Sequence, residues 1–160
     1  QAEDGIRDRS PSRGLGDVYK RQALIERYRV PVPRLILGAE LGGLATACID
    51  ISDGLVSDVG HICAASSVGC TIDAASVPLS SAATAVVSSD GLVLPTLLTG
   101  GDDYELAFAV RQGAENDVIA ISEKVGVPVT RIGTFESGKG VKVFDQNGKA
   151  MAFTETGYKH

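Results

Sequence analysis

Two acidic residues and a hydroxyl stand close together in the segment Asp50-Ile51-Ser52-Asp53-Gly54, which follows an apolar stretch. This segment is expected at the junction of a strand and a helix, a common place for binding sites in α/β folds. A helix N-terminus offers backbone N–H groups to phosphate oxygens, and Gly54 would let the backbone approach a ligand. The carboxylates repel phosphate, but Mg²⁺ binds both kinds of oxygen. Alternatively, Ser52 and Asp53 only cap the helix, which is the commonest role of these residue types there.

A second acidic segment is Thr99-Gly100-Gly101-Asp102-Asp103-Tyr104-Glu105-Leu106. A glycine pair followed by acids before a strand is a plausible ligand-binding loop. If the strand starts near Asp103, then Asp103 and Glu105 point to one face and Tyr104 to the other. The alternative is an ordinary turn whose acidic side chains are solvated.

The two segments together supply four carboxylates, on Asp50, Asp53, Asp102 and Asp103. If the loops are neighbours, unpaired carboxylates would repel one another and some of their pKa values would rise. A metal ion would resolve that conflict. Lys and Arg are scarce near both segments, so we expect a metal rather than basic side chains to offset phosphate charge. The pattern therefore predicts a Mg²⁺-dependent phosphoryl site.

The elements that must position these loops follow from periodicity. Apolar residues at helical spacing from Leu55 to Cys63 predict a helix that ends between residues 66 and 69. Strands alternating with helices before a terminal hairpin predict an α+β fold, a layered α/β sandwich with a mixed sheet. We further expect helices at 23–29, 78–87 and 114–125, strands at 44–51, 70–72, 104–110, 129–135 and 141–144, a loop at 97–103, and hairpin turns at 138–140 and 147–148.

Composition limits the function classes. The chain has 160 residues, enough for one domain, and a net charge of −5, which argues against a nucleic-acid partner. No apolar run approaches the roughly 18 residues that cross a membrane. The three cysteines, Cys48, Cys63 and Cys70, lack zinc-ligand spacing with His61. We interpret them as reduced, small core residues of a cytoplasmic protein.

Residues 1–22 differ from the rest of the chain. They are rich in charged side chains, have few large apolar ones, and show neither helical nor alternating spacing. The string from Glu3 to Gln22 also resembles a translated sequencing-library adapter. We expect this segment not to belong to the natural protein and to be disordered; a genuine disordered tail is the alternative. The globular pattern then runs over residues 23–160.

The acidic motifs in this order resemble those of the thiamine-monophosphate kinases. Residues 47–55, with Asp58 and His61 after them, are similar to that family's DxSDGL segment, and residues 99–106 to its Gly-Gly-acid-Asp-Tyr-Glu-Leu motif. The ending Gly157-Tyr158-Lys159-His160 is similar too. The resemblance implies the C-terminal domain of a two-domain fold shared with aminoimidazole ribonucleotide synthetase. It also implies that an N-terminal domain, which supplies most metal ligands and the dimer interface of a homodimer, is missing from this chain.

The resemblance implies an activity and a set of site residues. The activity is phosphorylation of thiamine phosphate by ATP with Mg²⁺, giving thiamine diphosphate. Asp50 and Asp53 would be Mg²⁺ ligands, and Ser52 would contact ATP. Asp102 stands where the family commonly has Glu; it would contact the thiamine substrate, and Tyr158 would pack against its rings. No covalent enzyme nucleophile is needed. The chain alone is expected to have little or no kinase activity.

Two alternatives stay open. One is another ATP-dependent enzyme of the same superfamily, such as selenophosphate synthetase or a hydrogenase maturation factor, against which the sequence from Gly100 to Leu106 argues. The other is a non-catalytic nucleotide- or metal-binding module. Mg²⁺-dependent binding of thiamine phosphates, rather than of nucleotides in general, would distinguish the implied kinase from such a module.

Overall fold

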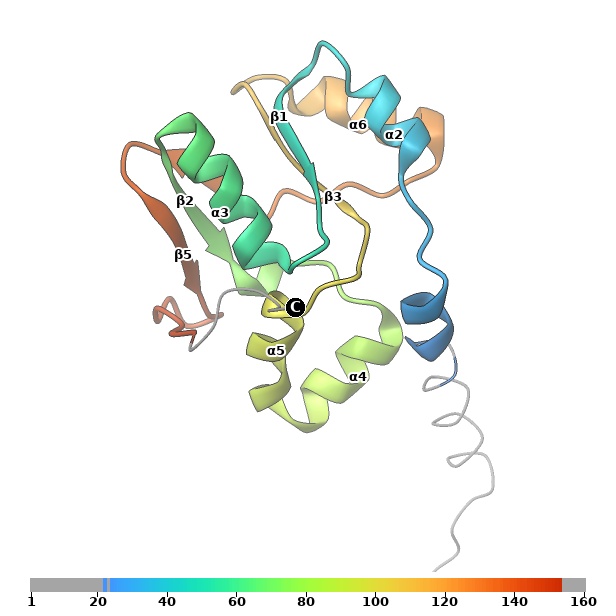
Figure 1. The fold of residues 1–160 in the computed structure, drawn as a ribbon, viewed down its shortest axis with the longest axis vertical. Helices are drawn as coiled ribbons and strands as arrows, with labels where there is room; N and C mark the ends of the chain where they lie inside the picture. The colour runs from blue at the N-terminus through green and yellow to red at the C-terminus, as the bar shows by residue number, and fades with distance from the viewer. Residues whose placement is uncertain (1–21, 23, 154–160) are drawn as a thin grey trace, which may run out of the picture.

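The helices and strands of the chain form an α+β fold (Figure 1). The computed structural model describes residue 22 and residues 24–153. Residues 24–29 are helical, as expected. The elements that follow are α2 (Leu35–Glu40), β1 (Ala45–Asp50), α3 (Leu55–Ser66), β2 (Gly69–Asp73), the short 3₁₀ helix η1 (Ala74–Ser76), α4 (Ser81–Ser89), the 3₁₀ helix η2 (Gly91–Val93), α5 (Leu94–Thr99), β3 (Leu106–Val110), α6 (Glu115–Val125), β4 (Gly133–Glu136) and β5 (Gly140–Phe144).

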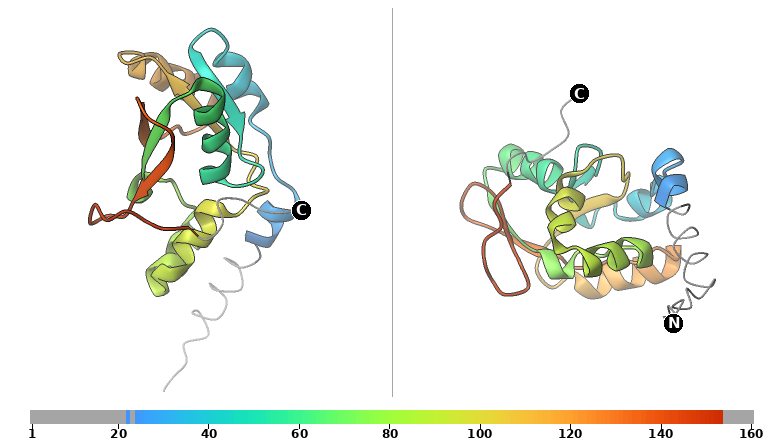
Figure 2. Two further views of the ribbon diagram at one scale, coloured as in Figure 1. Left: turned by 60° about the vertical axis from the view of Figure 1, so that its left-hand side comes forward. Right: turned by 90° about the horizontal axis from the view of Figure 1, so that it is seen from below.

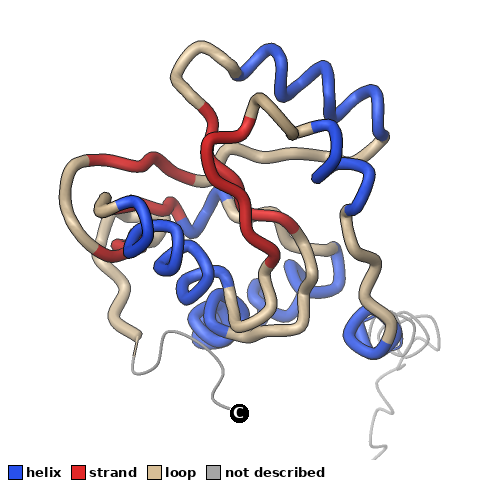
Figure 3. Tube along the Cα trace, turned by 45° about the horizontal axis from the view of Figure 1, so that its top comes forward, coloured by secondary structure: helices blue, strands red, loops and turns tan. Residues whose placement is uncertain are grey.

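The described strands form two sheets, which Figure 3 shows in red. β1 and β3 form an antiparallel pair in which Asp50 lies opposite Leu106. The other sheet has the order β4-β2-β5, with β4 antiparallel and β5 parallel to β2. This second sheet is mixed, so the predicted α+β class with a mixed sheet is confirmed.

β4 and β5 follow one another in sequence but do not pair; they flank β2 on opposite sides. Residues 137–139 therefore pass over the start of β2 at Gly69. A Cβ on Gly69 would lie 3.2 Å from the backbone nitrogen of Lys139 and 3.3 Å from the carbonyl carbon of Gly138. The hairpin predicted at 138–140 is thus wrong, because β4 and β5 do not pair. The sequence could not show this, since the same glycine-rich residues suit a turn between adjacent strands and a connection across a third strand.

Helix α3 joins the two sheets, since it contacts β1 and β3 on one side and β2 and β5 on the other (Figure 1). Its buried side chains Val56, Val59 and Cys63 form one cluster with Ile72 of β2 and Val143 of β5. The apolar spacing that predicted this helix is thus the spacing of its core face. Helices α2 and α6, light blue and orange in Figure 2, pack beside one another.

Helix boundaries differ from expectation where side chains decide them. α4 starts after Ser80, whose hydroxyl accepts the N–H of Ala83, and not at Pro78. α6 was predicted closely and ends at Gly126, which has φ +67°. The expected loop at 97–103 is instead partly the helix α5, where Pro95 sits in the first turn and fits a helix start.

Strand expectations were partly right. β1 alternates between half-buried and exposed residues instead of being fully buried. Cys48 therefore lies on its exposed side, so the core role holds only for the buried Cys63 and Cys70. β3 and β4 each begin later than expected. The turn at Asn147-Gly148 is confirmed, but it leads only to a bridge between Phe144 and Ala150.

No single helix among the described residues is long and apolar enough to cross a membrane. Two successive helical segments together have the length and apolar composition of a membrane span, but they are bent by 118° at the break between them: Ser81–Ser89 and Gly91–Thr99.

Candidate functional site

The two acidic loops lie directly against one another. The N–H of Asp102 donates to the carbonyl oxygen of Ser52 at 2.9 Å, and the N–H of Tyr104 to that of Ile51 at 2.8 Å. In return, the N–H of Ile51 donates to the carbonyl oxygen of Glu105 at 2.8 Å. These bonds continue the antiparallel pairing of β1 and β3 beyond the strand ends. The assumption that the two acidic loops are neighbours is therefore confirmed.

Glycines allow this close contact between the loops. A Cβ on Gly101 would lie 2.2 Å from the carbonyl oxygen of Ser52, and a Cβ on Gly54 2.6 Å from that of Thr99. Gly54 also has φ +121°, where L side chains are strained. We expected Gly54 to admit a ligand, but the group that approaches it is the backbone of the other loop.

The start of α3 is held by Asp58 and not by Ser52. Asp58 is 2% exposed, and its Oδ2 accepts the backbone N–H groups of Ser52 (3.0 Å), Asp53 (3.0 Å) and Gly54 (3.1 Å). The helix N-cap is Gly54, so the expected capping roles of Ser52 and Asp53 are both wrong. These three N–H groups, which we expected to be open to phosphate, already bind a carboxylate.

Three potential metal-ligating side chains gather at this end of α3. One ligand atom from each of Asp53, Asp58 and His61 lies within 4.8 Å of the others. Asp50 is exposed at the end of β1 and is not part of that group. Carboxylate oxygens are the ligands that Mg²⁺ prefers, so the donor chemistry of Asp50 and Asp53 fits the expected ion. Their assignment as ligands stays a prediction.

The second loop is not the extended strand that alternation suggested. Asp102 and Tyr104 have φ +68° and +51°, in the left-handed region, and β3 begins only at Leu106. Left-handed backbone is uncommon for a non-glycine residue and is more unusual for Tyr than for Asp. The condition under which Asp103 and Glu105 would share a strand face, a strand that starts near Asp103, is therefore not met. Asp102, the expected substrate contact, is exposed.

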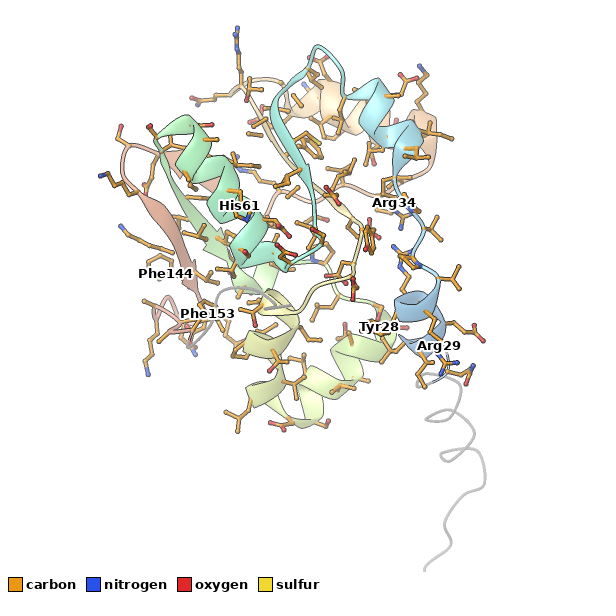
Figure 4. The ribbon with its side chains drawn as sticks, in the orientation of Figure 1. Tyr28, Arg29, Arg34, His61, Phe144 and Phe153 are labelled. Carbon is orange, nitrogen blue, oxygen red and sulfur yellow. The ribbon has the colours of Figure 1, made fainter. Side chains whose placement is uncertain are left out.

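Basic side chains do reach the second loop, contrary to expectation. Arg34 donates from Nε to Oε2 of Glu105 at 2.8 Å and from Nη2 to Oε1 at 2.7 Å, and Arg27 donates to Oε1 as well. Figure 4 shows Arg34 directed from the segment before α2 toward this loop. Both arginines are more than 70 residues from Glu105 in sequence, so local composition could not reveal them.

These ion pairs set the electrostatics of the loop. The hydrogen bonds and charge of Arg34, with the charge of Arg27, hold the pKa of Glu105 below its ordinary value, and the same bonds raise the pKa of Arg34. Asp103 is solvent-exposed by surface area, and desolvation by the surrounding loop, followed by the nearby Glu105 carboxylate, raises its pKa. Glu105 is thus a charged structural partner, and Asp103 is an acid whose charge is disfavoured. Tyr158 lies outside the described residues.

Residues 2–146 match the family described as AIR synthase related protein, C-terminal domain. The chain belongs to this family. The thiamine-monophosphate kinase of Salmonella typhimurium is 39% identical over 137 residues, covering 86% of this chain and 42% of that protein.

Solved structures give the same result. The crystal structure of thiamine-monophosphate kinase from Stenotrophomonas maltophilia K279a matches with a TM-score of 0.75 and 36% identity, covering 84% of this chain and 41% of that one. The structure described as AaThiL complexed with AMPPCP and TMP matches with a TM-score of 0.68 and 29% identity, covering 96% and 43%. The chain therefore resembles part of thiamine-monophosphate kinases and spans less than half the length of these relatives.

Proposed function

We propose that this chain is the C-terminal part of an enzyme that transfers the γ-phosphoryl group of ATP to thiamine phosphate, giving thiamine diphosphate. The observation that carries the proposal is the backbone hydrogen bonding that joins the loop at 50–54 to the loop at 100–105. It brings both family motifs to one place. The relatives named thiamine-monophosphate kinase favour this reaction over those of other superfamily members.

Each loop has a role in this proposal. Asp50 and Asp53 hold Mg²⁺, and Ser52 contacts ATP. Asp102 of the second loop contacts the thiamine substrate, with Tyr158 against its rings. Asp102 has a shorter side chain than the commoner Glu, and its left-handed backbone conformation sets the direction from which the side chain reaches the substrate.

Charge is the main obstacle to this reaction, because both the phosphoryl donor and the acceptor are anions. Catalysis then depends on positioning and on offsetting charge. Arg27 and Arg34 are already paired with Glu105, and the N–H groups of residues 52–54 are bonded to Asp58. Mg²⁺ would supply the neutralisation between phosphate oxygens and the site carboxylates. This chain's residues would bind and orient the two substrates.

The proposed enzyme is larger than this chain. Because the chain spans less than half of its relatives, we propose that the remaining part supplies further metal and nucleotide contacts and the interface of a homodimer. The chain alone then has little or no kinase activity. A cytoplasmic location and the separate origin of residues 1–22 stay predictions.

The proposal is tested with the full-length gene that contains this sequence. The purified protein is given ATP and thiamine phosphate with and without Mg²⁺, and thiamine diphosphate is measured; the 160-residue chain is assayed in parallel. We expect Mg²⁺-dependent product from the full-length protein and at least a 100-fold lower rate from the chain. Binding of ATP without any product would favour the non-catalytic module. Full turnover by the chain alone would contradict the need for the rest of the enzyme.

A further inference from the structure

Among the residues that the structure describes, Asp58 is the one charged residue that is buried, with 2% of its surface exposed. A buried carboxylate is costly unless hydrogen bonds compensate for the lost water. Here one oxygen accepts three backbone N–H groups, at 3.0, 3.0 and 3.1 Å. The positive end of α3 also favours a negative charge at this place, since Asp58 lies in its first turn. The arrangement accounts for the burial.

The three donors are consecutive residues that precede the helix, whereas the acceptor belongs to the helix itself. The bonds therefore fix residues 52–54 relative to α3, which is packed in the core. On the other side, the carbonyl oxygen of Ser52 accepts the N–H of Asp102. The loop is thus held between Asp58 and the second acidic loop. Neither contact involves the hydroxyl of Ser52 or the carboxylate of Asp53.

Three N–H groups that converge on one point form an anion site of the kind that binds phosphate in other proteins. In this chain the anion is the protein's own carboxylate. The backbone N–H groups of residues 52–54 are consequently committed to Asp58. The orientation of the Ser52 and Asp53 side chains depends on the backbone that Asp58 holds.

We propose that Asp58 is a positioning residue, which presents Ser52 and Asp53 to the metal and nucleotide by fixing the backbone of residues 52–54. This inference rests on the proposed function for its kinetic consequence. It acts through the first loop, whereas the expected thiamine contact, Asp102, belongs to the second. Loss of the Asp58 charge should therefore affect Mg²⁺ use and kcat more than KM for thiamine phosphate.

The test compares Asp58→Asn with Asp145→Asn in the full-length protein. Asp145 is the matched control, because its carboxylate also accepts backbone N–H groups, from Asn147 and Lys149, in a turn outside the site. Thermal melting first establishes that both variants are folded. The readouts are kcat, KM for thiamine phosphate, the Mg²⁺ concentration for half-maximal rate, and amide hydrogen exchange of residues 51–55 with and without Mg²⁺.

We expect Asp58→Asn to lower kcat about 10- to 100-fold and to raise the Mg²⁺ requirement several-fold, with KM for thiamine phosphate within about twofold. Its amides at 52–54 should exchange faster, and Asp145→Asn should match the wild type. A folded Asp58→Asn whose amides at 52–54 exchange as in the wild type would overturn the proposal. If its Mg²⁺ requirement is nevertheless raised, Asp58 acts instead as a direct metal ligand with Asp53 and His61. If Asp58→Asn does not fold, Asp58→Glu is measured in the same way, because it keeps the charge but displaces it.

The exchange measurement separates this inference from the proposed function. If the wild-type protein forms no thiamine diphosphate, the kinase assignment fails. The positioning role would then still be supported if the amides of residues 52–54 exchange faster in Asp58→Asn and Mg²⁺ slows their exchange less than in the wild type. Unchanged exchange, with and without Mg²⁺, would overturn it.

Discussion

Glu105 illustrates how a motif residue can support the site through its own ion pairs. Its carboxylate receives two hydrogen bonds from Arg34 and one from Arg27. This connects the N-terminal helix and the segment before α2 to the second acidic loop. The backbone carbonyl oxygen of Glu105 also accepts the N–H of Ile51, so the same residue contributes to the contact between the two loops.

Replacing Glu105 by Gln should destabilise the protein modestly. The ion pair is partly exposed, at 44% for the Glu105 side chain, so solvent screening limits its contribution to about 0.5–1 kcal/mol. The matched control is Glu123→Gln, an exposed glutamate of α6 outside the first turn of that helix, and it should have almost no effect. Chemical denaturation of both variants measures the difference.

The stability difference caused by Glu105→Gln should depend on pH in a defined direction. The pKa of Glu105 is lowered in the folded state, chiefly by Arg34. A lowered pKa means that the charged form contributes stability above the unfolded-state pKa of about 4.3. That contribution is lost as the pH falls through the folded-state pKa. A difference between wild type and variant that grows toward lower pH would contradict this assignment.

At the residue scale, sequence reasoning singled out the two acidic loops, which the structure brings together, but not the partners of their side chains. Asp50, Asp53 and Asp102 were singled out by their spacing. The role of Asp58 was missed, although an acid four residues after Gly54 in a predicted helix could have signalled a contact with the preceding loop. Arg34 gave no local signal, because it lies 71 residues from Glu105 in the sequence.

At the scale of elements, the site depends on two loops that pack without side chains between them. Gly101 fits only because it has no Cβ, since an added Cβ would lie 2.2 Å from a carbonyl oxygen. Gly91, in the 3₁₀ helix η2, is a matched control with no atom within 4 Å of an added Cβ.

We expect Gly101→Ala to cost about 1–3 kcal/mol through the forced backbone shift. Gly91→Ala should be neutral or slightly stabilising. Melting temperatures and kinase rates of the two variants check this. The prediction fails if Gly101→Ala has the same melting temperature as Gly91→Ala and keeps the wild-type kinase rate, because the loops would then tolerate separation.

Elements with a strong local signal were predicted well, and those that depend on distant contacts were not. α6 has helical periodicity and a glycine that ends it, and the core face of α3 follows its apolar spacing. α5 was missed because its short apolar sequence carries no period, and tertiary contacts with α3 decide its conformation. The passage of residues 137–139 over β2 depends on strand order, which local sequence does not encode.

At the scale of the whole molecule, α3 connects the mixed sheet to the β1–β3 pair, and the site lies at the N-terminal end of this helix (Figure 1). The sheets and the helix core thus fix where the acidic loops meet. The α+β class could be predicted because helices and strands alternate along the chain. The division into two sheets could not, since the strands give no sign of their partners.

The central claim is that a carboxylate of the first loop enables Mg²⁺-dependent phosphoryl transfer. The most direct measurement is kcat for thiamine diphosphate formation by the full-length protein carrying Asp53→Ala, with Asp117→Ala as control. Asp117 is an exposed acid in the first turn of α6, away from the loops. We expect Asp53→Ala to lower kcat by about 100-fold or more and Asp117→Ala to keep the wild-type rate. Equal rates for two folded variants would contradict the central claim.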